Sequence, residues 1–156
     1  MNVKIRRFNK KDAEKVSQII ENCYLKLNIG GHTKKGLQLQ ICWNSPENLL
    51  KRSENIKYYV ALDKNRIVGV CGYNTNKVHT LFVDIQYQKK GVGKELLSKV
   101  LNEARKEGLS SIKTWSTFYA EEFYRSFGFI RKKEIQLPQG KKDVVLIEME
   151  KTFYID

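Results

Sequence analysis

Val83-Asp84-Ile85-Gln86-Tyr87-Gln88-Lys89-Lys90-Gly91-Val92-Gly93-Lys94 is the stretch of this chain that decides its fold. Upstream of it, residues 77–84 are rich in apolar side chains and predict a strand. Downstream, apolar residues recur at helical spacing over residues 92–104 and predict an amphipathic helix. The stretch therefore joins a strand to a helix through a basic loop with two glycines. Because the first N–H groups of a helix lack intrahelical partners and attract anions, we expect a phosphate to approach the backbone at Gly91 and Gly93.

The residues around the glycines exclude the two best-known phosphate motifs. A P-loop requires a glycine at the position of Gln88 and Ser or Thr at that of Glu95. A dinucleotide-binding fingerprint requires a third Gly or Ala at the position of Leu96, and it follows the first strand of its unit, whereas this loop follows the fourth predicted strand.

The pattern that remains, Gln-x-x-Gly-x-Gly after a strand, resembles the acyl-CoA pyrophosphate loop of the GNAT superfamily of N-acyltransferases. The similarity runs from Val83 to Leu97, and Ile85 stands where a proline is usual. The resemblance implies acetyl-CoA as the co-substrate, with Thr117 at a position where the family often has Asn. The expected cofactor contacts are Leu81, Phe82, Val83, Gln88, Lys89, Lys90, Gly91, Val92, Gly93, Lys94, Thr117 and Tyr124.

The composition fits one domain over residues 1–156. The chain is 41% hydrophobic, which is enough for a core, and it has only two prolines and no linker-like or repeated segment. Its formal net charge of +12 is spread over every segment, and the cluster at 89–94 is the one we assign to a ligand phosphate.

Three further features favour a cytoplasmic protein. The charged N-terminus lacks the apolar region of a signal peptide, and no apolar run approaches the ~20 residues that cross a membrane. Cys23, Cys42 and Cys71 are odd in number and widely spaced, which predicts reduced core thiols and neither disulfides nor a metal site.

The order of the predicted elements is β-α-α-β-β-β-α-β-α-β-β. This is an α/β (α+β) class and also the order of the GNAT fold, with a mixed, mostly antiparallel sheet of about seven strands and about four helices. The region 27–43 is unassigned, although Leu37, Leu39 and Ile41 alternate weakly. The predicted strands are 3–8, 57–62, 66–73, 77–84, 112–116, 129–137 and 143–151, and the predicted helices follow Asn9 and cover 46–52, 92–106 and 119–127.

A second motif, residues 120–129, resembles the GNAT pattern A-x-x-F-Y-x-x-x-G-F, whose tyrosine lies near the coenzyme sulfur. Part of it, 125–132, also resembles the RNA-stacking strand of RRM domains, but with mismatches at Ser126 and Lys132. The spacing of Ala120, Phe123 and Phe127 is helical, and it would scatter these side chains on a strand. RNA binding is therefore the remote alternative.

The GNAT resemblance implies direct transfer of an acetyl group from acetyl-CoA to an amine in a ternary complex. This reaction needs a donor to the thioester carbonyl, a neutral amine and a proton for the leaving thiolate. In the family a backbone N–H near Val83 supplies the donor, and main-chain groups of Leu81 and Val83 hold the pantetheine arm. The proton source maps to Tyr124, whose phenol has an ordinary pKa near ~10.

The general base is open at this stage. Lys77 stands where some family members have Glu, and it cannot serve unless its pKa is strongly perturbed. His79 lies on the same face of the strand and titrates in a suitable range, so it is the catalytic candidate. The alternatives are a structural or substrate-contacting histidine and deprotonation through water. His32, in the glycine-containing stretch, is a candidate for the acceptor site, and Trp43 and Tyr73 are either an apolar wall or core residues.

Two function classes remain in play, an acetyltransferase and a GNAT-fold module that binds acyl-CoA without turnover. The acceptor is a small-molecule or peptide amine: a polyamine, an amino acid, an antibiotic, a protein N-terminus or a lysine. We expect no metal, no membrane and no nucleic-acid partner, and a homodimer stays open.

Overall fold

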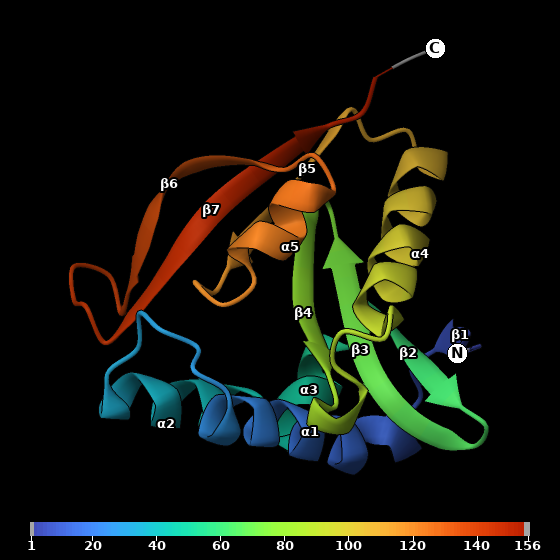
Figure 1. Cartoon of the computed structure of the whole chain (residues 1–156), viewed down its shortest axis with the longest axis horizontal. Helices are drawn as coiled ribbons and strands as arrows, with labels where there is room; N and C mark the ends of the chain where they lie inside the picture. Colours follow the sequence, from blue (N-terminus) through green and yellow to red (C-terminus); the bar gives the residue numbers. More distant parts are fainter. Residues whose placement is uncertain (1, 155–156) are drawn as a thin grey trace.

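A seven-stranded sheet in the order β1-β2-β3-β4-β5-β7-β6 runs through the computed structural model, which describes residues 2–154 (Figure 1). The outermost residues of the expected domain 1–156 lie outside it. Within the described residues, β4 and β5 are the one parallel pair, and every other neighbouring pair is antiparallel. The mixed sheet confirms the predicted α/β class. The strands are β1 (Lys4–Arg7), β2 (Lys57–Asp63), β3 (Arg66–Asn74), β4 (Lys77–Val83), β5 (Ser111–Ser116), β6 (Ile130–Leu137) and β7 (Val144–Thr152).

The described residues form five α-helices, one more than expected. They are α1 (Ala13–Lys26), α2 (Lys34–Trp43), α3 (Pro46–Arg52), α4 (Val92–Lys106) and α5 (Glu121–Ser126). None of them is long and apolar enough to cross a membrane.

The additional helix, α2, occupies the region that the sequence left unassigned. The weak alternation of Leu37, Leu39 and Ile41 did not predict this helix. Thr33 caps the helix by accepting the N–H of Gly36 at 3.0 Å. Leu37 and Ile41, four residues apart, pack on one core cluster, whereas Leu39 is exposed.

Two apolar clusters lie on opposite faces of the sheet. Helix α1 packs on one cluster, which includes Val60 and Val70 of the central strands. Helix α4 packs on the other with a fully buried stripe, as its periodicity predicts. The residues of this stripe are Val92, Leu96, Leu97, Val100, Leu101 and Ala104.

The parallel pairing of β4 with β5 is unusually short. It covers only Lys77↔Lys113 and Val78↔Thr114. Immediately afterwards β4 contains Thr80 at φ +58°, and its register with β3 shifts between Val70 and Gly72. This irregularity has the character of a β-bulge, which bends a strand. The rest of β4 therefore makes no strand pairing on the side that faces β5. In Figure 1, β6 and β7 lie on the far side of the β4–β5 pair from β2 and β3.

Residues 125–132 do not form one strand. Arg125 and Ser126 end α5, Gly128 turns at φ +90°, and β6 begins only at Ile130. The RNA-stacking strand of the RRM alternative is therefore contradicted by the structure.

Helix α2 contacts the turn between β6 and β7 so closely that Gly36 has no room for a side chain. A Cβ at Gly36 would overlap the main-chain oxygen of Asp143. We expect Gly36→Ala to lower the free energy of unfolding by about 1–3 kcal/mol, although Ala is the better helix former. Lys35→Ala, at an exposed position of the same helix, is the control and should change it by no more than about 0.5 kcal/mol. Urea denaturation measures both, and a Gly36→Ala protein as stable as the parent would contradict this packing.

Candidate functional site

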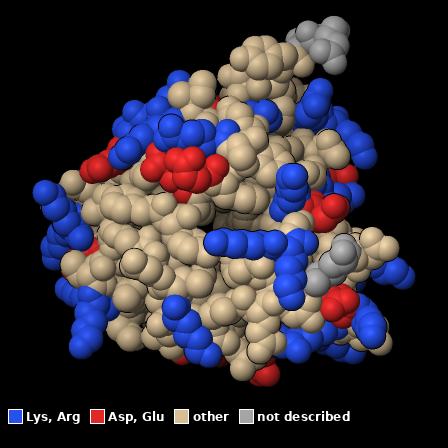
Figure 2. Space-filling model, in the orientation of Figure 1, with Lys and Arg blue, Asp and Glu red and all other residues tan. Residues whose placement is uncertain are grey.

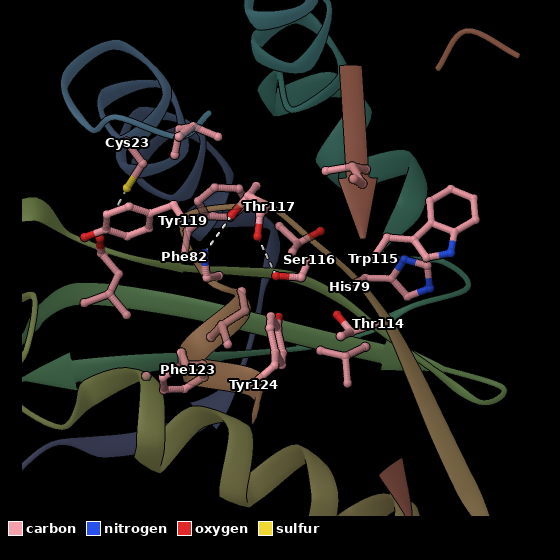
Figure 3. A pocket seen from close by; sticks show the side chains of 18 of the residues that line it. Cys23, His79, Phe82, Thr114, Trp115, Ser116, Thr117, Tyr119, Phe123 and Tyr124 are labelled. Carbon is pink, nitrogen blue, oxygen red and sulfur yellow. Dashed lines mark hydrogen bonds between the residues drawn. The ribbon is translucent and has the colours of Figure 1, made fainter. Parts of the chain in front are cut away.

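A cavity of about 1130 Å³ opens where β4 and β5 separate (Figure 3). It is lined by all of β4, by residues 114–117, by the loop before α4 and by α5, and also by parts of α1, α2, β6 and β7. Figure 2 shows a hollow on this face of the molecule with Lys and Arg side chains beside it. Of the predicted site residues, the cavity is lined by His79, Leu81, Phe82, Val83, Gln88, Lys89, Gly91, Gly93, Lys94, Thr117 and Tyr124.

The loop has the backbone of an anion site. Gly91 lies at φ +90° directly before α4, and a Cβ there would meet nothing within 4 Å. Lys89 also has a positive φ, of 59°. Such a left-handed turn before a helix exposes the first N–H groups of that helix to the cavity. Lys89 and Lys94 add positive charge at the same end.

Two of the predicted loop contacts do not line the cavity. The side chain of Val92 is buried in the core beneath α4, so only its backbone can reach a ligand. Lys90 lies over the ring of Tyr87, 5.5 Å from its centroid, and is exposed to solvent. The sequence signal covers the whole loop, but alternate residues of a tight turn point in different directions.

The peptide groups of Val83 face the gap. Asp84 donates its N–H to the oxygen of Val68 on β3 at 2.8 Å, and in an antiparallel ladder the neighbouring residue then directs its groups the other way. The oxygen of Val83 accepts Gln88 Nε2 at 2.6 Å and the thiol of Cys23 at 3.3 Å. Both donors are side chains, so a ligand that carries an N–H can replace them.

Tyr124 reaches the cavity from α5 and is nearly buried. Its ring makes edge contacts with Phe123 and Phe129, at centroid distances of 5.6 and 5.3 Å. Burial raises the pKa of its phenol, so the hydroxyl stays protonated and can donate. Thr117 lies at the start of the same segment, and its Oγ1 accepts the N–H of Ala120 at 3.2 Å. The hydroxyl of Thr117 therefore already has a structural role.

His79 lies on the face of β4 opposite to α4, and Figure 3 shows it with Trp115 at one end of the cavity. Its Nε2 lies 2.7 Å from Asn74 Oδ1, which can only accept, so Nε2 carries the proton and Nδ1 has a free lone pair. Burial, with the charges of Lys77 and Arg52, lowers the pKa of His79 to about 4. The imidazole is therefore neutral at pH 7.

His32 is not part of the cavity lining. Its Nδ1 lies 2.9 Å from the main-chain oxygen of Gly30, and its backbone forms a β-bridge with Val144 of β7. His32 therefore stabilises the segment between α1 and α2. Trp43 lines the cavity and is exposed, whereas Tyr73 is a core residue whose hydroxyl donates to Glu107 at 2.7 Å.

Apart from Trp43, which was a candidate, the sequence missed the wall that α1, α2 and β7 contribute. Its residues include Cys23, Tyr24, Gln40 and Val144, which lie 48 to 65 positions from the nearer end of the loop 88–94. Their types carry no chemical signal of their own. The three cysteines were predicted as core thiols: Cys23 and Cys71 are buried, whereas Cys42 is exposed, so the prediction was wrong there. Burial raises the pKa of Cys23 to about 12, with a contribution from the charge of Asp84.

A family model described as an acetyltransferase (GNAT) domain matches residues 37–153, a stretch that contains the loop, β4, α5 and most of the cavity. This chain belongs to the GNAT acetyltransferase family.

Solved structures extend the likeness over the whole GNAT fold. A GCN5-related N-acetyltransferase from Rhodopseudomonas palustris has a TM-score of 0.90 at 15% identity, over 98% of this chain and 97% of that one. The PaiA N-acetyltransferase from Thermoplasma acidophilum, in complex with coenzyme A, has a TM-score of 0.80 at 21% identity, over 98% and 100%. The yncA acetyltransferase from Salmonella typhimurium, with its cofactor acetyl-CoA, has a TM-score of 0.68 at 18% identity, over 100% and 96%.

One curated relative of this GNAT protein is an uncharacterised N-acetyltransferase of Methanocaldococcus jannaschii. It is 30% identical over 81 residues. The matched stretch covers 50% of this chain and only 36% of that relative.

The lowered pKa of His79 can be measured directly. We expect its ring to titrate at about 4, and Lys77→Met to raise that value by removing a positive charge. Because the unfolded chain takes up this proton near pH ~6.5 and the folded chain does not, stability should fall as the pH drops from about 6.5 to about 4. NMR of the His32→Gln variant, in which His79 is the one histidine, gives the titration. A midpoint near 6.5 would contradict the buried, cationic surroundings.

Proposed function

We propose that this protein transfers an acetyl group from acetyl-CoA to the nitrogen of an amine, directly in a ternary complex. One observation carries the proposal: the gap between β4 and β5 joins a basic helix N-terminus, main-chain groups of β4 that do not pair with β5 and a protonated phenol in a single cavity. Membership of the GNAT family, and the coenzyme A and acetyl-CoA bound by the PaiA and yncA proteins, support it.

The cofactor is held at the loop end. Its pyrophosphate binds the N–H groups at the start of α4, beside Lys89 and Lys94, because the helix dipole and the lysines both favour negative charge. Its pantetheine arm runs along the unpaired edge of β4 and exchanges hydrogen bonds with the main chain of Leu81 and Val83. Gln88 then gives up its bond to the oxygen of Val83.

The chemistry takes place in the gap. The N–H of Val83 donates to the thioester oxygen and stabilises the negative charge that develops there. The amine nitrogen forms a bond to the carbonyl carbon, the carbon–sulfur bond breaks, and Tyr124 donates a proton or a hydrogen bond to the leaving sulfur. Burial keeps the phenol protonated, but the same rise in its pKa makes it a weaker acid, so Tyr124 is better suited to donating a hydrogen bond than a full proton.

The amine must also lose a proton. The free Nδ1 of His79 accepts a hydrogen bond from the amine or from a water molecule, and this orients the nitrogen lone pair toward the carbonyl. A pKa of about 4 makes the ring a weak base, so the proton passes on to water.

The pyrophosphate site is tested by thermal unfolding. We expect acetyl-CoA at 100 times its Kd to raise Tm by roughly 5–10 °C. Gly91→Glu should abolish this shift, because it places a carboxylate beside the phosphates and a side chain at φ +90°. Gly140→Glu is the matched control: Gly140 also has a positive φ and open space around it, but it lies in the β6–β7 turn outside the cavity lining. Absence of a shift in the parent protein at saturating acetyl-CoA would refute the site.

The role of Tyr124 is tested by Tyr124→Phe. We expect kcat to fall by at least about tenfold, while the Kd for acetyl-CoA stays within about twofold because the ring still packs on Phe123 and Phe129. Release of the coenzyme A thiol measures turnover, and isothermal titration calorimetry measures binding. Tyr154→Phe, at an exposed tyrosine, is the control. Unchanged turnover in Tyr124→Phe would remove the proposed proton donor. Binding of acetyl-CoA without thiol release from a broad amine panel would favour a non-catalytic module.

A further inference from the structure

We propose that the acceptor is a small primary amine that also carries an anionic group, such as a carboxylate, and that Lys77 binds this group. The proposal rests on the function proposed above and names its substrate class. It excludes polyamines and other polycations as the preferred acceptors.

The acceptor half of the cavity lies across β4 from the cofactor chemistry. Val78 is buried in the cluster beneath α4, so Lys77 and His79, one position away on either side, face the opposite side of the strand. On β5, Thr114 and Ser116 are buried, whereas Trp115 between them faces the other way and is partly exposed. Lys77, His79 and Trp115 all line the cavity, and α2 adds Trp43.

Lys77 is a cation without an anionic partner. Its Nζ lies 3.1 Å from the centroid of the Trp115 ring, and within the described residues no carboxylate lies within 4.0 Å of it. Burial lowers its pKa to about 8, against an opposing contribution from Glu148, so the ammonium form is costly as it stands. An anion on Lys77 would offset that cost.

A second cation, Arg52, acts on His79 through its charge although it does not line the cavity. Arg52 lies over the ring of Trp43, 4.8 Å from its centroid, and it donates to three neutral oxygens, those of the Trp43 main chain, Asn44 and Tyr58. Its charge, like that of Lys77, contributes to the lowered pKa of His79. The field at the His79 ring is therefore positive.

No acidic side chain balances this field from the cavity wall. Among the described residues that line the cavity, none is Asp or Glu. Glu148 accepts the indole N–H of Trp115 at 3.3 Å, but it does not line the cavity. A polycation would meet only like charge here, whereas an anionic group gains an ion pair. The same field favours the neutral, reactive form of the amine.

The walls around these cations are apolar, and they select the body of the acceptor. Leu39 and Trp43 come from α2, Trp115 from β5, and Leu137 and Pro138 from the end of β6. An apolar amino acid combines the three features that this half of the cavity fits: an amine, a carboxylate and an apolar side chain.

The test compares three amines that differ in charge. L-Phenylalanine has the carboxylate, phenethylamine lacks it, and spermidine is a polycation. We expect kcat/KM for phenylalanine to exceed that for phenethylamine by roughly 10- to 100-fold, the range for a hydrogen bond to a charged group. Spermidine should be the poorest acceptor. Release of the coenzyme A thiol is measured at saturating acetyl-CoA.

Substitutions at two lysines distinguish loss of the ion pair from a general loss of folding or activity. Lys77→Met should bring kcat/KM for phenylalanine down to the level of phenethylamine, so that the preference is lost, and Lys77→Arg should restore most of the preference. Lys113→Met is the matched control: Lys113 pairs with Lys77 in the β4–β5 register but does not line the cavity. Binding of acetyl-CoA by each variant confirms that the fold is intact.

The outcomes distinguish this proposal from the acetyltransferase activity itself. If spermidine or phenethylamine is the preferred acceptor, or if the preference for phenylalanine survives Lys77→Met, the proposed acceptor class is wrong. The acetyltransferase activity would stand in either case. If acetyl-CoA binds but none of the three amines is acetylated, the rise in Tm that each N-acetylated product causes in the presence of coenzyme A is compared instead. A larger shift with N-acetylphenylalanine than with N-acetylphenethylamine supports the proposal, and equal or absent shifts overturn it.

Discussion

The parallel pairing of β4 with β5 ends after two residues, and the site depends on this interruption. A continued ladder would satisfy the main-chain groups of Val83 and close the space between the strands. Because the ladder stops beside the bulge at Thr80, the main-chain groups of Val83 face a cavity. The side chains of Gln88 and Cys23 donate hydrogen bonds to the Val83 oxygen there. The same gap admits Tyr124 from α5 and exposes the start of α4. A local failure of sheet pairing thus brings a helix N-terminus, a strand edge and a phenol into one space.

Desolvation in this space sets the protonation of the groups around it. Burial keeps the phenol of Tyr124 protonated, and it lowers the pKa of both His79 and Lys77. The cavity is basic at both ends, but for different ligands: Lys89 and Lys94 stand at a helix N-terminus suited to phosphates, whereas Lys77 stands on an aromatic wall. One cavity therefore suits an anionic cofactor at one end and, as we propose, an acceptor with an anionic group at the other.

Much of the fold follows from local sequence. The apolar stripe of α4 and the strand that ends at Asp84 have strong periodicity, and both are observed. Helix α2 was missed because its start depends on a single cap, Thr33, and because two glycines precede it. Among the site residues, Lys90 and Val92 belong to the loop but not to the cavity lining, since a motif does not say which way each side chain of a turn points. His32 looked like a site residue on composition alone, yet it supports the loop beside β7.

The sequence by itself determined the strand–loop–helix junction and the family likeness that its motifs carry, because each motif lies within about fifteen consecutive residues and depends on local backbone preference. Only the tertiary structure decided how β4 and β5 part, which walls α1, α2 and β7 contribute, and that Lys77 lies on Trp115 with no carboxylate partner among residues 2–154. These features join residues that are far apart in the chain, and the pKa of a side chain depends on every group that packs around it. The junction at 83–94 therefore carries the likeness to an acyl-CoA loop, whereas the acceptor that we propose depends on contacts that form only when the sheet is assembled.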